Sequence, residues 1–404
     1  MRALKRTLAA GLAATLLATG AAGQKLLDKD LPANHPRNDP YTRGEAELME
    51  GAGIVSHGGF EFGNSDTAGV EDLLATSDIR WLETEHFELG LALGTYRVPQ
   101  KEKKKIRADL ARLAQRLPTV NPKAKTLDPW LRTHLFAMRL EEMYDDFLEL
   151  VQVEQSVFPD GSKPWDQTGT YWGEGPHLGQ KGKYEVLILP SEASHLTYLS
   201  DQFGLQIKRT QRWNVPERDT LTVTIHVQQG TLKADPALHG HLAFNLAHNF
   251  FDGLRHYTYD TPIWLHEGLA HFLERRIDPR FNSFDGAEGS IPEMSRKSDW
   301  ETPVKKLVNA EKAPRLAALV RKNNYGQLSL DDHFCTWSMI DFLHRTRPEG
   351  LAALLVNLKG RTGEDGFGDG SNLPEAHREL FKEQFGMSYS QFDSAWAEWV
   401  LATY

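Results

Sequence analysis

Cysteine is almost absent from this sequence. The single Cys335 excludes an intramolecular disulfide bond. Cys335 lies in an apolar, periodic stretch (HFCTWSMIDFL), so we predict a buried, unreactive thiol rather than a nucleophile. The stability of the fold must therefore come from burial of apolar side chains, for which a chain of 404 residues is long enough.

A surplus of positive charge is also missing. The chain has 46 Lys and Arg residues against 55 Asp and Glu residues, and its formal net charge is −9. Proteins that bind nucleic acids neutralise phosphates with clustered Lys and Arg side chains. The charge balance therefore argues against a nucleic-acid partner.

Long hydrophobic runs are absent after the N-terminus. The one such run extends from Leu8 to about Ala22, follows three basic residues and ends in small residues, which is the pattern of a secretory signal peptide over 1–23. The alternative is an uncleaved membrane anchor. A spanning helix needs about 20 apolar residues, whereas this run is shorter and is interrupted by Gly11 and Gly20. We therefore expect a secreted or periplasmic protein with no membrane span after removal of the signal.

The remaining pattern predicts an α+β fold. Segment 24–77 is rich in Gly, Pro, Asn and Asp and reads as a loop-rich arm with at most one short helix around Glu45 to Glu50. Segment 78–234 is predicted to be a sheet-containing lobe, and segment 235–404 a two-helix core followed by a helical lobe. The expected elements of the last two segments are an edge strand or hairpin from Asp78, helices at 100–117 and 130–153, strands at 184–189 and 221–227 with a helix between them, helices within 235–279, and helices around 303–322, 331–346, 349–358, 374–385 and 390–402.

The strand at 221–227 (LTVTIHV) alternates apolar and polar residues, which predicts a half-exposed strand. Such a strand could hold an extended peptide by main-chain pairing. The sequence Ser329 followed by Asp332 predicts a capping box at the start of the helix at 331–346.

The chemically informative stretch is 235–279, which contains the sequence HEGLAH from His266 to His271. A zinc-binding H-E-x-x-H motif has its histidines four residues apart on one helix face. Here they are five residues apart and diverge by about 140° around a helix, so they cannot share one metal ion from a single helix.

The longer segment PIWLHEGLAHFLE, at 262–274, resembles the second zinc helix of the gluzincin metallopeptidases (the thermolysin-like, peptidase MA-like group), W-L-x-E-G-x-A-x-[YF]-x-E. The resemblance implies that Glu267 is the third metal ligand. In that family the ligand often follows the second histidine of H-E-x-x-H after 18 residues, which leads back to His248 in NLAH. The resemblance covers roughly 78–404 and implies a zincin-like fold, with a small mixed sheet and a mostly helical C-terminal lobe.

The sequence departs from the family where hydrolysis would need it. Phe244 and Asn245 stand where the motif has His and Glu, so H-E-x-x-H becomes F-N-L-A-H. A phenyl ring cannot bind zinc, and an amide cannot accept the proton of a metal-bound water. We therefore assign no catalytic residue and predict an inactive, binding or scaffold protein without a cofactor, whose candidate partner is a peptide or protein segment.

Two alternatives remain open at this point. His271 lies four residues after Glu267, so a relocated zinc site of His248, Glu267 and His271 is one hypothesis, with a zinc-dependent hydrolase as its function. A hydrogen-bonded buried cluster of the same three residues is the other. The resemblance also implies that a Tyr or His of the helical lobe stabilises the oxyanion; His333 is the candidate, and a surface histidine at a helix start is its alternative.

Overall fold

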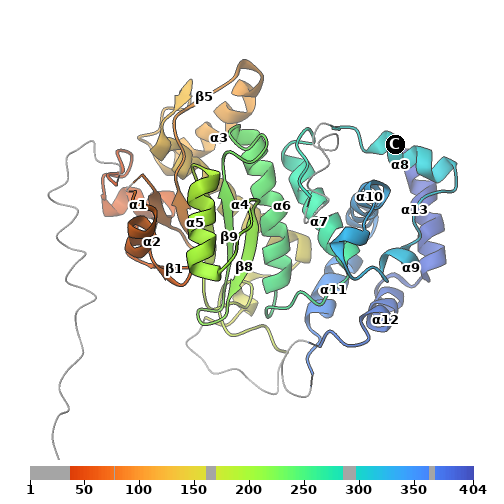
Figure 1. Ribbon diagram of the computed structural model, residues 1–404. Coiled ribbons are helices and arrows are strands. Elements are labelled where there is room, and N and C mark those ends of the chain that lie inside the picture. The colour runs from red at the N-terminus through yellow and green to blue at the C-terminus, as the bar shows by residue number, and fades with distance from the viewer. Residues whose placement is uncertain (1–36, 77, 161–169, 285–296, 364–368) are drawn as a thin grey trace, which may run out of the picture.

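The computed structural model describes residues 37–76, 78–160, 170–284, 297–363 and 369–404. It confirms an α+β chain in which a mixed sheet with flanking helices lies beside a helical C-terminal region (Figure 1). The predicted signal peptide lies outside the described residues. Among the described residues, no helix is both long and apolar enough to cross a membrane.

The central sheet has five strands in the order β3-β4-β7-β9-β8. The expected hairpin is present as the antiparallel pair β3 and β4. β4, β7 and β9 are parallel to one another, and β8 pairs antiparallel with β9. The strands are β3 (Arg80–Glu83), β4 (Phe87–Leu91), β7 (Tyr184–Leu189), β8 (Gln211–Val215) and β9 (Thr220–His226).

Helices cover both faces of this sheet. On β7, Val186 and Ile188 pack into the core that includes α4 (Pro129–Val151) and α6 (Asp235–Gly253). The intervening Leu187 and Leu189 pack instead with residues of α2 and α5. Because successive side chains of a strand point to opposite faces, these two clusters lie on opposite sides of the sheet. The bounds of the second pair of helices are α2 (Thr67–Leu74) and α5 (Glu192–Phe203).

The prediction of a half-exposed strand at 221–227 is wrong. Every residue of β9 is buried, and β9 pairs with β7 on one side and β8 on the other. Its main-chain groups are therefore not available to an added peptide. Among the described residues, the edge of the sheet on this side is β8, which the sequence analysis did not predict.

The loop-rich arm contains more structure than expected. Besides the expected short helix, it forms a small hairpin and a second helix, α2, whose first turn is capped by Asp66. A further two-stranded ribbon and a helix precede α4. These elements are α1 (Ala46–Ala52), β1 (Glu61–Phe62), β2 (Ser65–Asp66), β5 (Tyr96–Arg97), α3 (Lys103–Arg116) and β6 (Thr126–Leu127).

The C-terminal region is helical, as predicted. Ser329 and Asp332 form the expected capping box at the start of its longest helix, which also buries Cys335 as expected. The predicted helix at 303–322 is two helices instead of one. The elements are α7 (Ile263–Ile277), α8 (Glu301–Asn309), α9 (Leu316–Leu319), α10 (Leu330–Thr346), α11 (Pro348–Lys359), α12 (Leu373–Phe385) and α13 (Tyr389–Thr403).

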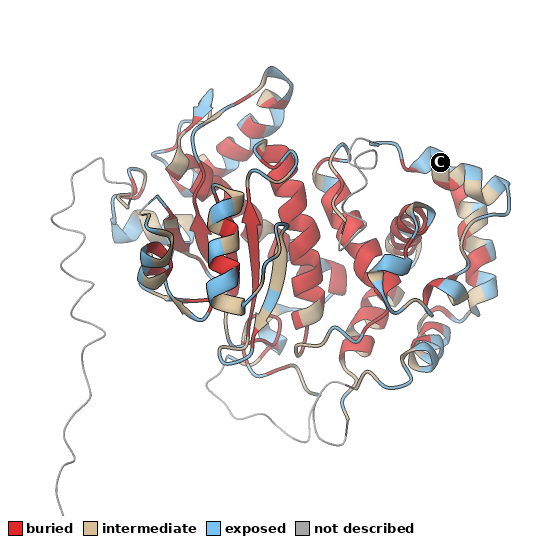
Figure 2. Ribbon diagram, viewed as in Figure 1, coloured by how far each residue is buried: buried red, intermediate tan, exposed pale blue. Residues whose placement is uncertain are grey.

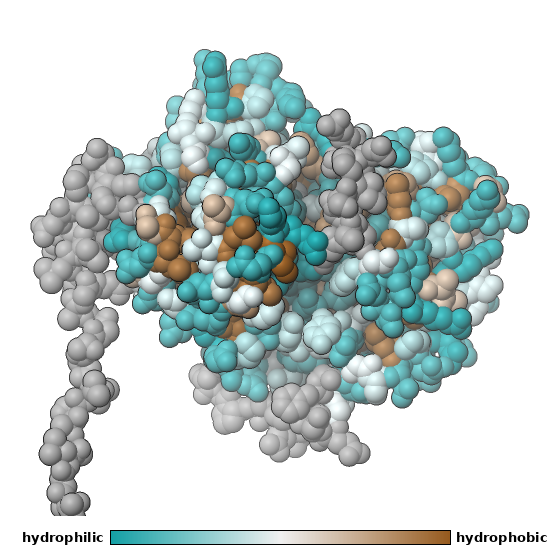
Figure 3. Space-filling view, in the orientation of Figure 1, coloured by the Kyte–Doolittle hydropathy of each residue, from teal (hydrophilic) through white to brown (hydrophobic). Residues whose placement is uncertain are grey.

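Burial is concentrated where the two regions meet. Figure 2 shows α6, α7 and the inner strand β9 as mostly buried and the edge strand β8 as partly exposed, and a single core cluster runs from the sheet through these helices to α13. The face seen in Figure 3 is mainly hydrophilic, with a hydrophobic patch in the region of α2 and α5. The helices α6 and α7, which carry the suspected site, therefore lie in the interior of the molecule.

Candidate metal centre

Glu267 lies where α6, α7 and α10 meet, and a glycine allows α7 and α10 to approach closely. Gly268 faces α10 so closely that a Cβ atom there would lie 2.7 Å from Ile340 Cγ1 and 2.9 Å from the Thr336 carbonyl oxygen. Only a residue without a side chain permits this approach. As a result, the middle of α10 lies directly against the middle of α7, and α6 also packs against α7.

Three imidazole rings surround the Glu267 carboxylate. His248 Nε2, from α6, lies 3.4 Å from Glu267 Oε1. His271 Nε2 and His333 Nδ1 lie 3.4 Å and 3.3 Å from the other oxygen, Oε2. The four side chains are at most 1% exposed. Glu267, His271 and His333 offer ligand atoms that all lie within 4.8 Å of one another, so this group could bind a metal ion.

The hydrogen bonding of this group is incomplete. His271 Nε2 and His333 Nδ1 lie 3.0 Å apart and share one hydrogen bond, whose direction depends on the tautomers. Within the described part of the chain, neither oxygen of Glu267 accepts an aligned hydrogen bond, and neither ring nitrogen of His248 takes part in one. A buried ionised carboxylate is costly unless a positive charge lies beside it, and either a protonated imidazole or a bound cation would supply that charge.

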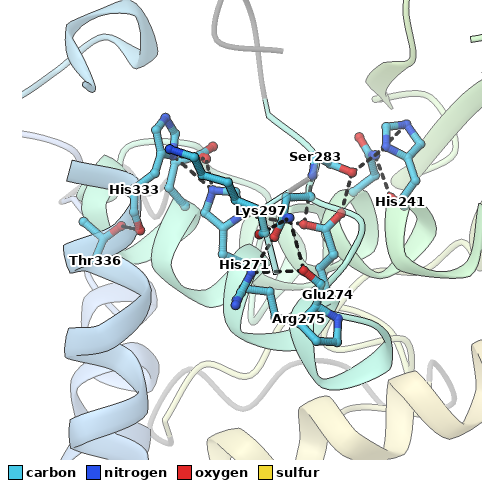
Figure 4. Close-up of polar contacts among 12 residues, drawn as sticks. His241, His271, Glu274, Arg275, Ser283, Lys297, His333 and Thr336 are labelled. Atoms are coloured by element: carbon cyan, nitrogen blue, oxygen red, sulfur yellow. Dashed lines mark hydrogen bonds and ion pairs between the residues drawn. The ribbon is translucent and has the colours of Figure 1, made fainter. Parts of the chain in front are cut away.

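A second carboxylate lies behind His271. Glu274 Oε2 is 3.6 Å from His271 Nδ1, the ring nitrogen that faces away from Glu267. Ser283 fixes Glu274, since its backbone N–H donates at 2.9 Å and its hydroxyl donates to the second oxygen. Ser283 Oγ also contacts His241 Nδ1 at 2.8 Å. Figure 4 shows this run of side chains from His333 through His271 and Glu274 to Ser283 and His241.

The pKa values of Glu267, His271 and His333 are shifted in different directions. Burial would raise the pKa of Glu267, but His248, His271 and His333 outweigh it and hold the pKa well below its usual range. Burial would lower the pKa of His271, but Glu267 and Glu274 outweigh it and raise the pKa. For His333 burial dominates and lowers the pKa. The group therefore holds an ionised carboxylate among imidazoles of unequal basicity.

Phe244 and Asn245, which precede His248 on α6, contact other groups than the Glu267 carboxylate. The ring of Phe244 packs against the rings of His248 and His271, with centroids 5.0 and 5.2 Å apart. The amide of Asn245 donates to the His241 carbonyl at 2.8 Å and accepts from Arg212 at 3.1 Å. The Asn245 amide also contacts His241 Nε2 at 3.3 Å, and none of its three hydrogen bonds is made with Glu267.

The remaining predicted residues fall as follows. His248, Glu267 and His271 lie together: helical spacing predicted the contact between Glu267 and His271, and the family resemblance implied the place of His248, which contacts the opposite carboxylate oxygen from His271. The expectation of a surface position for His333 is wrong, because only 1% of its side chain is exposed and it contacts Glu267. His266 lies outside the group and stacks on His248 with centroids 5.5 Å apart.

Sequence reasoning missed the carboxylate behind the site. Glu274 belongs to the quoted helix motif, but its partner Ser283 lies in the irregular segment after that helix and carries no recognisable motif. For the packing of α10 against α7, Gly268 was the available signal, since a glycine inside a helix indicates a close approach by another element.

A comparison of the whole chain with known proteins returned no match to any family model and no match to a curated protein.

Proposed function

We propose that the chain is an exported protein of the gluzincin, peptidase MA-like fold whose hydrolytic centre is degenerate and which acts as a binding or scaffold protein. One observation carries the proposal. The place of the general base is taken by Asn245, whose amide is engaged by His241 and Arg212 rather than turned toward Glu267. An amide cannot accept the proton of a metal-bound water, so peptide hydrolysis lacks its base.

The closure of the centre supports the same proposal. A catalytic zinc site keeps one coordination position open to water and substrate. Glu267 and His271 are fully buried, and Phe244 packs over the side where the family motif would supply a ligand. Zinc held here would therefore act structurally.

The alternative function is a zinc-dependent hydrolase with relocated ligands. It is favoured by one observation, namely that Glu267, His271 and His333 form a group able to hold a metal ion. It requires a new general base. Glu274 is the second carboxylate beside His271, 3.6 Å from its Nδ1, but it is already bound by both the amide and the hydroxyl of Ser283. This arrangement favours an orienting role over proton transfer.

A binding role would use a different strand from the one first considered. The edge of the sheet nearest to α6 is β8, whose Arg212 reaches Asn245 on that helix. A peptide in extended conformation would add to β8, because β9 is paired on both sides.

Turnover of a quenched fluorescent peptide library by the mature chain, with zinc supplied, tests the proposal. We expect the wild type to hydrolyse no more than a Glu267→Gln variant, because neither has a general base. The matched control is His344→Ala on α10, which changes a histidine outside the group. Turnover that chelator abolishes, and that Glu267→Gln loses while His344→Ala retains it, would contradict the proposal.

A further inference from the structure

We infer that Glu267, His271 and His333 bind one divalent cation of the zinc type, which joins α7 to α10 as a structural centre. The inference concerns the centre on which the proposed function rests. It assigns His333 as a ligand in place of the His248 of the family pattern, and it gives His248 and Glu274 supporting roles.

The spacing of the three donor atoms fits such an ion. Zinc ligands lie about 2.0–2.1 Å from the metal, so two of them are about 3.3–3.4 Å apart at tetrahedral angles and about 2.9 Å apart at right angles. Glu267 Oε2 lies 3.4 Å from His271 Nε2 and 3.3 Å from His333 Nδ1. The two nitrogens are 3.0 Å apart. All three edges fall within the range that four- or five-coordinate zinc requires.

The hydrogen bonds favour an ion over a cluster held by protons alone. In a cluster without metal, His271 Nε2 and His333 Nδ1 share one hydrogen bond, so one of these two nitrogens donates its proton to the other. That proton is then not directed at the Glu267 carboxylate. Among the described residues, three imidazole nitrogens lie 3.3–3.4 Å from the carboxylate, and none of them is aligned as in a normal hydrogen bond. A cation bound to both nitrogens and to Glu267 Oε2 satisfies all three atoms at once.

The surrounding groups match those of a built metal site. A histidine that binds a metal commonly donates its second ring N–H to a carboxylate, which fixes the tautomer and orientation of the ring. Glu274 lies in that place behind His271, 3.6 Å from Nδ1, and Ser283 holds it. His248 lies 3.4 Å from the oxygen of Glu267 that faces away from His271. Two carboxylates and one divalent cation also make the buried group neutral.

The test is the zinc content of the full mature chain after purification without chelator and after addition of zinc. We expect about one zinc per chain in the wild type, none in His333→Asn, and one in His344→Ala, whose histidine is on the same helix. A Glu274→Gln variant should keep the site and weaken zinc binding about 10- to 100-fold, as expected for an orienting carboxylate. Wild type without zinc, or His333→Asn with full zinc, would overturn the assignment.

A second measurement needs no variant and covers the case in which His333→Asn does not fold. Cobalt added to the wild type should give the visible absorption of a four- or five-coordinate ion with histidine ligands. An unchanged spectrum of hydrated cobalt would overturn the inference. Peptide hydrolysis by a zinc-loaded wild type would instead refute the proposed function and leave the metal site standing, so the two failures are distinguishable.

Discussion

Two of the fully buried glutamates, Glu185 in the sheet and Glu267 among the helices, have opposite surroundings. Glu185 on β7 accepts hydrogen bonds from the Gly63 amide at 3.0 Å on both oxygens and pairs with Arg218. Glu267 on α7 has three imidazole nitrogens at 3.3–3.4 Å and no aligned donor among the described residues. Burial of a carboxylate therefore does not by itself mark a site; the groups around it decide.

The pKa shifts of the two glutamates follow from these surroundings. Burial raises the pKa of Glu185, and Arg218 offsets only part of that effect. Burial also acts on Glu267, but three imidazoles outweigh it, and the pKa falls. Arg218 must also serve Glu88 at 2.9 Å, so one guanidinium compensates two buried carboxylates. The sheet cluster (Glu88, Glu185 and Arg218) is a structural ion pair. The helix cluster (Glu267 with its three histidines) has the composition of a metal-ligand set.

The largest expected effect comes from removing the partner of Glu185. Arg218→Met keeps much of the apolar stem but leaves a buried carboxylate without its cation. We expect a loss of about 3–5 kcal/mol in the free energy of unfolding, measured in urea at pH 8. The control is Arg378→Met, which removes an exposed ion pair with Glu375 and should change stability by less than about 1 kcal/mol. A loss below 1 kcal/mol for Arg218→Met would show that the pair is not structural.

The next effect concerns metal linkage at Glu267. Free zinc at about 100 times its dissociation constant should raise the free energy of unfolding by about 2.7 kcal/mol, because only the folded chain presents the assembled ligands. Glu267→Gln should abolish the increment. Glu185→Gln, a change of the other buried glutamate, should retain it. Equal increments in the two variants would show that the two clusters do not differ in metal binding.

The pH dependence of stability should report the sheet cluster. Burial and the nearby Glu185 raise the pKa of Glu88 from 4.5 to about 7. Because the folded state then holds this proton more tightly than the unfolded state, the contribution to stability is full below about pH 4.5 and is lost as pH rises through 7. Glu88→Gln should flatten the curve between these values and stabilise the chain at pH 8 by about 1–3 kcal/mol. Curves of equal slope for variant and wild type would contradict the assignment.

A smaller effect is expected from introducing the sequence H-E-x-x-H at His248. The double variant Phe244→His with Asn245→Glu creates this sequence on α6 and replaces the Phe244 ring, which packs against His248 and His271, by an imidazole. An added histidine ligand should tighten zinc binding about tenfold, or about 1.4 kcal/mol, measured by competition with a chromogenic chelator. Unchanged affinity in a folded double variant would count against the gluzincin-like placement of His248 and Glu267.

Much of the framework could be predicted because it depends on local patterns. Apolar periodicity located α6, α7 and α10. The pair of His248 and Glu267, which the structure places 3.4 Å apart, was implied by the resemblance to the family rather than by a local pattern. Strand β8 was missed because QRWNV is short and mostly polar, as an edge strand can be. The alternation in β9 misled because its threonines are buried under α5 rather than exposed.

The rest of the site could not be predicted because it depends on tertiary contacts. His333 is 62 residues from His271, and its place depends on the packing of α10 against Gly268. The link between Glu274 and Ser283 likewise spans the turn at 278–281, which the Asp-Pro pair signals without indicating that Ser283 comes back to Glu274. Helical spacing fixes which residues share one face, but it does not determine which helix packs against that face.

The most direct test is the anomalous scattering of a crystal of the zinc-loaded chain, recorded at the zinc absorption edge. The account predicts one peak bonded to Glu267 Oε2, His271 Nε2 and His333 Nδ1 at about 2.0–2.2 Å, with His248 and Glu274 outside the coordination sphere. A zinc-loaded crystal without a peak between these three residues, or with a peak bonded to His248 and Glu267 but not to His333, would contradict it.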